Sequence, residues 1–191
     1  MRDLWDKPWF SVLTKLTYSA YLNILWLICS LPIFTIGAST SALLYASMKL
    51  HDKEGYVTSN FFSSFKENFK QATEIWLIYL VIGILLGFDF VMGNQAKDTL
   101  GVCMQGAAMI LAIPYFLSLL YVFGVQSRFV NPVKDTIRYS FFMALRNMKC
   151  TIQMAILMIL LVWANTTVLL VNFLTLVYGF GLMGYFFAAY Y

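Results

Sequence analysis

Four long stretches of this chain are apolar and almost free of charge, and they limit what the chain can fold into. They cover residues 16–48, 75–93, 99–127 and 150–191. Asp89 is the only charged residue within them. A helix needs about 20 apolar residues to cross a bilayer, so each stretch is long enough for one crossing and the last for two. Only 12% of the residues are charged, against about 25% in soluble domains. We therefore expect an all-α, polytopic helical membrane bundle that forms one integral membrane domain over residues 1–191.

The first stretch is interrupted between Pro32 and Gly37. Proline removes a donor that a helix interior needs, and glycine allows the backbone angles of a turn, so the chain can turn back here. A single crossing would give five spans and leave four basic residues outside. These are Arg2, Lys7, Lys15 and Lys97. A turn would give six spans and leave only Lys97 outside, of 13 Lys and Arg. Because cytoplasmic loops are enriched in Lys and Arg, we favour six spans over five and expect both termini to be cytoplasmic.

The six expected spans follow from the apolar stretches and their breaks. They lie near residues 17–33, 38–50, 73–92, 101–124, 150–164 and 167–188. The second is short, because residues 38–50 reach only about 20 Å as a helix. Two pairs of small residues, Gly83 with Gly87 and Ala108 with Ala112, have the four-residue spacing that lets helices approach closely in a membrane.

Residues 58–72 have the periodicity of an amphipathic helix, and we expect this helix to lie on the cytoplasmic surface. Its apolar side would consist of Phe62, Phe65 and Phe69, and its charged side of Lys66, Glu67 and Lys70. A side with mixed charge gains little from anionic lipid, so we expect it to contact a protein, where charge arrangement sets specificity. Residues 3–17 form a further candidate interfacial helix, which brings the expected number to two or three.

Another surface helix is expected over residues 131–149, with Asn131 as its cap and Pro132 at its first position. Its apolar stripe consists of Val133, Ile137, Phe141, Ala144 and Met148. Phe142 lies off this stripe, and the helical pattern gives no reason for it. The basic residues of the region are Arg128, Lys134, Arg138, Arg146 and Lys149. Only Asp135 opposes them, so we expect contact with anionic headgroups of the lipid bilayer or with an acidic partner.

Asp89 is the only carboxylate well within a predicted span, and such acids are costly and often bind protons or solutes. We expect Asn165 and Asn172 to lie at the same outer level. The chain contains no GxxxxGK[ST], GxSxG or HExxH motif, and its three cysteines and one histidine do not form a metal-binding pattern. We therefore expect no enzyme activity, no cofactor and no metal. A basic loop next to a membrane also needs no nucleic acid to explain it.

Three segments resemble the YesL-like family of small bacterial multi-spanning membrane proteins, which contain a domain of unknown function. They are "SLPIFTIGASTSALLYASMKL" at 30–50, "FFSSFKENFKQATEIWLI" at 61–78 and "YVFGVQSRFVN" at 121–131. The position of Asp89 between the last two also fits. The resemblance implies a place in the bacterial cytoplasmic membrane.

Genes of this family often lie beside ABC-type sugar importers and glycan-degrading enzymes. The resemblance therefore implies an accessory or regulatory protein of carbohydrate uptake, acting through a sugar importer or another membrane protein. The residues leave open an alternative, a small solute transporter or channel that uses the region of Asp89.

Overall fold

The structure is a computed structural model, and it is built of helices. It describes residues 8–52, 54–96, 99–167, 175, 179 and 181–184. The helices are α1 (Pro8–Cys29), α2 (Ile36–His51), α3 (Val57–Gln95), α4 (Thr99–Arg128), α5 (Val133–Arg146) and α6 (Met148–Thr167), with a 3-10 turn η2 (Ile33–Thr35) before α2. The described part of the chain contains no strand, which confirms the all-α class.

The chain turns between α1 and α2, as the sequence predicts. Beyond the turn the two helices lie side by side. A hydrogen bond joins them, which the indole nitrogen of Trp26 donates to Thr40 Oγ1 at 3.1 Å. The Thr35 hydroxyl lies within 2.6 Å of the carbonyl oxygens of Cys29 and of Pro32. It thereby satisfies backbone acceptors that the end of α1 leaves without partners. We call α1, η2 and α2 the first hairpin.

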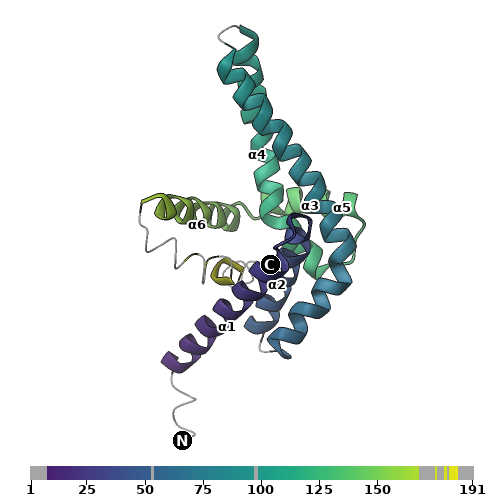
Figure 1. Cartoon of the computed structure of the whole chain (residues 1–191), viewed down its shortest axis with the longest axis vertical. Helices are drawn as coiled ribbons and strands as arrows, with labels where there is room; N and C mark the ends of the chain where they lie inside the picture. The colour runs from purple at the N-terminus through teal and green to yellow at the C-terminus, as the bar shows by residue number, and fades with distance from the viewer. Residues whose placement is uncertain are drawn as a thin grey trace, which may run out of the picture.

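The helix α2 lies in the middle of the bundle, between α1 on one side and α3 and α4 on the other (Figure 1). Ten of its 16 residues are buried. Its apolar side chains meet Leu22 of α1 and Val57 and Phe61 of α3 in one buried cluster. Close approach depends on Gly37, since a Cβ there would lie 2.4 Å from the carbonyl oxygen of Ala72.

The helix α3 is continuous over 39 residues, about 58 Å. The expected surface helix 58–72 and the expected span 73–92 are therefore parts of one helix, not two. No glycine or proline occurs between Val57 and Ile82 to end it. The helix α4 returns beside the outer half of α3, and the pair projects from the rest of the molecule as an arm (Figure 1).

By length and composition, α3 and α4 can each cross a membrane, and α5 with α6 passes the same test only as a pair bent by 98°. The described residues thus support two or three spans, and six spans remain a prediction. The helix α2, with 16 residues, reaches about 24 Å, less than the roughly 30 Å of a hydrocarbon core. Most of the expected span 167–188 lies outside the described residues.

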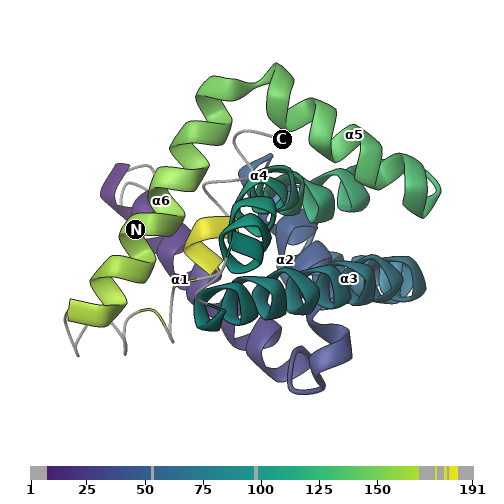
Figure 2. The same cartoon turned by 90° about the horizontal axis from the view of Figure 1, so that it is seen from above.

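The helices α5 and α6 run across the direction of the arm at its base (Figure 2). The helix α5 is shorter than the predicted 131–149. It begins after Pro132, which occupies the N-cap without a side-chain hydrogen bond, and the chain bends at Asn147. Asn131 does not cap it as expected. Instead the Asn131 carbonyl oxygen accepts hydrogen bonds from the Gln71 side chain and from Thr136 Oγ1.

Candidate functional site

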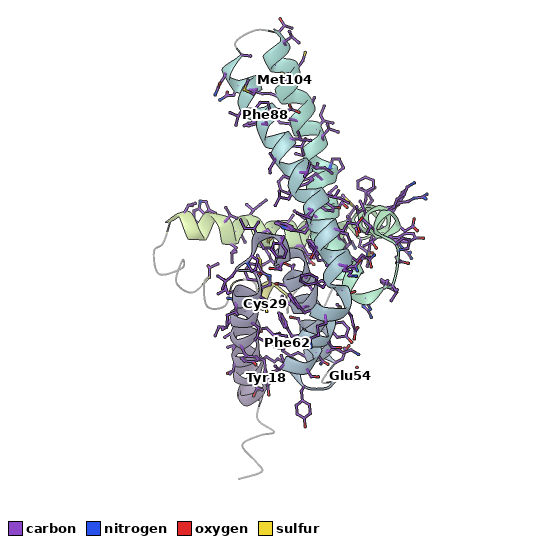
Figure 3. The ribbon with its side chains drawn as sticks, turned by 45° about the vertical axis from the view of Figure 1, so that its right-hand side comes forward. Tyr18, Cys29, Glu54, Phe62, Phe88 and Met104 are labelled. Atoms are coloured by element: carbon purple, nitrogen blue, oxygen red, sulfur yellow. The ribbon has the colours of Figure 1, made fainter. Side chains whose placement is uncertain are left out.

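The surface chemistry of α3 changes between Glu74 and Trp76, and we call this point the junction. Before it the exposed side chains include Lys66, Glu67, Lys70 and Glu74. After it they are Leu77, Val81, Ile82, Ile84, Leu85 and Phe88, among others. Figure 3 shows Phe88 and Met104 on the arm, and Cys29, Glu54 and Phe62 on the other side of the molecule. The arm is therefore the part whose surface suits lipid.

The tip of the first hairpin lies at the junction. The Trp76 indole nitrogen donates a hydrogen bond to the Ile33 carbonyl oxygen at 2.9 Å. The same indole packs against the ring of Phe123, with centroids 6.4 Å apart. The first hairpin consequently runs beside the charged half of α3 and not beside its apolar half. The tip exposes large apolar side chains, with Leu31 80% exposed and Ile33 66%.

The apolar face predicted for residues 58–72 is wrong by one position. Phe61 is fully buried, whereas Phe62 is 39% exposed, and Phe65 and Phe69 are partly buried. The buried stripe of this part of α3 is Val57, Phe61, Ser64 and Ala72. Two adjacent phenylalanines fit either register of a helical pattern, and the small residues of α2 decide which of them enters the core.

The charged side of α3 lies where the sequence predicts. Lys66, Glu67 and Lys70 are exposed, and Glu67 Oε1 accepts a hydrogen bond from Ser63 Oγ at 2.7 Å. Within the described residues, the salt bridges join Lys49 to Glu54 and His51 to Asp52, and neither involves Lys66 or Lys70. The charges at 66 and 70 are thus not used inside the fold.

The structure contains a buried polar network between α3 and α4 that the sequence analysis did not predict. Asn68 Nδ2 donates to Ser64 Oγ at 3.2 Å, and Gln126 Nε2 donates to Asn68 Oδ1 at 3.4 Å. Gln126 is only 2% exposed. The sequence contains one indication of this network, the helical spacing of Ser64, Asn68 and Gln71. It places three polar side chains on one side of α3, next to the buried stripe.

The five basic residues predicted to contact lipid or a partner are all exposed at the end of α4, along α5 and at the start of α6. A groove of about 580 Å³ lies between the last turns of α4 and α5. Arg146 lines it together with Val125, Phe129 and Phe142. Sequence periodicity alone did not predict this groove, because the α4–α5 connection forms one of its walls.

Asp89 is exposed on the outer half of α3. It lies 13 residues beyond Trp76, which is about 20 Å along the helix. A cavity of about 240 Å³ between α3 and α4 is lined by Gly83, Gly87, Ala108 and Ala112, but not by Asp89. The two predicted small faces therefore border one cavity, and Tyr115 of α4 packs closely against Gly83.

Of the other candidate polar positions, only the backbone of Asn165 is described. The helix α6, which contains Asn165, lies at the base of the arm (Figure 1). The side chain of Asn165 and all of Asn172 lie outside the described residues. No group of three or more His, Cys, Asp or Glu side chains in the described ranges is placed to hold a metal ion.

Two comparisons relate this chain to known proteins. Residues 19–90, from α1 to the outer half of α3, match the family described as "Protein of unknown function, DUF624". The chain is also similar to the "Uncharacterized protein YesL" of Bacillus subtilis (strain 168), at 26% identity over 141 residues. That match covers 71% of this chain and 66% of the relative, slightly less than two thirds of its length. No solved structure matches. Residues 19–90 therefore resemble the DUF624 family, and the chain is similar to YesL over 71% of its length.

Proposed function

We propose that this protein is an accessory or regulatory membrane protein that acts by binding another membrane protein. The observation that supports the proposal is α3, in which one continuous helix joins a lipid-suited half to an exposed charged side. Phe61 and Ala72 are fully buried behind that side, so the helix holds Lys66, Glu67 and Lys70 in fixed relative positions. A rigid surface loses little conformational freedom on binding, which favours its use as a contact.

The proposed location is the bacterial cytoplasmic membrane, with the arm of α3 and α4 crossing it and with both termini and the charged side of α3 inside. The six-span prediction is the alternative, in which α1 and α2 also cross. The distribution of basic residues supports this sidedness. The segments 49–70 and 128–149 contain nine of the 13 Lys and Arg, and they lie on the same side of the junction. Cytoplasmic segments are enriched in these residues.

The proposed partner is a membrane protein of carbohydrate uptake, such as an ABC-type sugar importer. This part rests on the family resemblance and on the mixed charge of the α3 surface. A surface with both signs of charge discriminates among proteins through complementary charge, because juxtaposed like charges are unfavourable. The transport alternative has less support, since Asp89 lines neither cavity.

The test is to reverse Lys66 and Lys70 to Glu and to identify the proteins that cross-link to the chain in native membranes. We expect recovery of a specific partner to fall about tenfold, because like charges would then face each other. The matched control reverses Arg138 and Arg146 to Glu. It changes the net charge by the same amount on another surface, where we expect it to disturb topology or lipid attachment and not the charge contact with that partner.

The same membranes report the sidedness, in a background that lacks Cys29, Cys103 and Cys150. A cysteine placed at Asn94 should react with an impermeant reagent from outside, and one placed at Lys134 should not. An unchanged set of cross-linked proteins for Lys66→Glu/Lys70→Glu, at matched expression, would overturn the partner role of this surface. Labelling at position 134 from outside would overturn the proposed orientation.

A further inference from the structure

The groove between α4 and α5 combines an apolar wall with a positive edge. Its apolar wall includes Val125 and Phe129 from the end of α4 and the residue that follows it, and Phe142 and Met143 from α5. Arg146 and Tyr139 line the same space and supply polar groups. An apolar channel that ends at a guanidinium matches a ligand with an anionic head and an apolar tail.

Phe142, which the helical pattern did not explain, has a place in this arrangement. The buried face of α5 consists of Thr136, Ser140 and Ala144, so Phe142 does not face the bundle. It is 54% exposed and lines the groove. Arg138 and Arg146 lie one helical turn before and after it, and the Arg138 guanidinium carbon is 5.7 Å from its ring centroid. A large aromatic residue is thus held between two cations at the groove.

The groove lies at the depth where phospholipid headgroups would be. The contact between Trp76 and Phe123 marks the junction on α4. Val125 and Phe129 follow Phe123 by two and six residues, about 3 and 9 Å further along the chain. The headgroup layer of one leaflet is roughly 5–8 Å thick. With the apolar arm in the bilayer, Val125 therefore falls within that layer and Phe129 near its cytoplasmic edge.

The charge around the groove favours an anion. Residues 128–149 contain five basic side chains and one acidic side chain, a net charge of +4, which equals the net charge of the whole chain. The basic side chains are all exposed. A zwitterionic headgroup would bring its own ammonium group towards these cations, whereas a headgroup with net negative charge would not.

We propose that this groove is a binding site for one anionic phospholipid. The phosphate lies at Arg146, Arg138 adds positive charge beside Phe142, and one acyl chain lies along Val125, Phe129 and Phe142. Basic pockets at the inner membrane surface bind anionic headgroups in this way. The apolar wall distinguishes a lipid from free phosphate, which would use only the arginines.

The test measures binding of phosphatidylglycerol to the purified full-length protein in detergent, by native mass spectrometry. Phosphatidylcholine with the same chains and glycerol phosphate without chains are the comparison ligands. We expect phosphatidylglycerol to bind best and Arg146→Gln to weaken it about fivefold, the effect of one charge near the surface. Lys134→Gln is the matched control, because it removes one charge from the same helix but does not line the groove. It should change the affinity less than twofold.

Phe142→Ser provides a second variant, since this exposed side chain can be replaced without opening the core. It should weaken phosphatidylglycerol but leave glycerol phosphate unaffected. Equal binding of phosphatidylcholine, binding of glycerol phosphate as tight as that of phosphatidylglycerol, or equal effects of Arg146→Gln and Lys134→Gln would each overturn the lipid site. Unchanged lipid binding together with loss of a cross-linked protein in Arg146→Gln would instead assign the groove to a protein partner.

Discussion

The helix α2 and the outer half of α3 are both apolar, yet they have opposite surroundings. Ten of the 16 residues of α2 are buried by other helices. In the most apolar 18-residue window of α3, only 11% is buried inside the protein. The two segments differ in side-chain size, since residues 37–42 of α2 are Gly, Ala, Ser, Thr, Ser and Ala, whereas residues 77–86 of α3 are mainly Leu, Ile and Val.

The difference indicates that residue size, together with hydropathy, separates the helix surfaces that are buried by protein from those that are left exposed. Lipid tails are as apolar as leucine, so apolar character alone does not drive helices together in a bilayer. Small side chains let backbones approach, which is how Gly37 comes close to Ala72. Large aliphatic side chains on the arm have no such partner and are left for lipid.

The largest effect on stability is expected for Phe61 of α3, whose side chain packs against α2. Phe61→Ala should destabilise the protein by about 3–5 kcal/mol, because it empties a fully buried site. Phe62→Ala, at the exposed neighbour, should cost about 0.5 kcal/mol or less. The measurement is the thermal midpoint of the detergent-solubilised protein, followed by size-exclusion chromatography. Equal losses for the two variants would show that the register of α3 on α2 differs from the one described.

Alanine substitutions at two glycines, Gly37 and Gly87, should show a smaller difference in stability. Gly37→Ala should cost about 1–3 kcal/mol, since the new Cβ would lie 2.4 Å from a backbone oxygen and 2.5 Å from Trp76 Cβ. Gly87→Ala, where a Cβ meets nothing within 4 Å, should be neutral or stabilise the helix by up to about 1 kcal/mol. The same thermal assay distinguishes them. A destabilising Gly87→Ala would mean that the arm packs on another protein surface there.

The smallest effect concerns the hydroxyl groups of α2. Ser41 is fully buried, and its hydroxyl has no hydrogen-bond partner within the described residues. Ser41→Ala should change stability by no more than about 0.5 kcal/mol, because it removes an unsatisfied group and keeps the small size. Ser118→Ala should cost about 1–2 kcal/mol, since Ser118 Oγ pairs with the Tyr79 hydroxyl. A large loss for Ser41→Ala would show that these serines act through hydrogen bonds and not through their size.

The sequence by itself determined the helical class, the turn between Pro32 and Gly37 and the charged side of α3. Each depends on local properties, namely apolar run length, the backbone limits of proline and glycine, and the spacing of charges along one helix. The basic helix α5 was predictable for the same reason, although its capping and its end were not.

Only the tertiary structure decided which apolar residues face protein. Phe61 rather than Phe62 is buried because α2 has room for it there, and a periodic pattern in α3 contains no information about α2. The groove at Phe142 likewise needs the end of α4, the following loop and α5 together. Length and hydropathy alone could not tell whether α1 and α2 lie beside the apolar or the charged half of α3. The tertiary contact between Trp76 and Ile33 decides this, because it places the tip of the first hairpin at the junction.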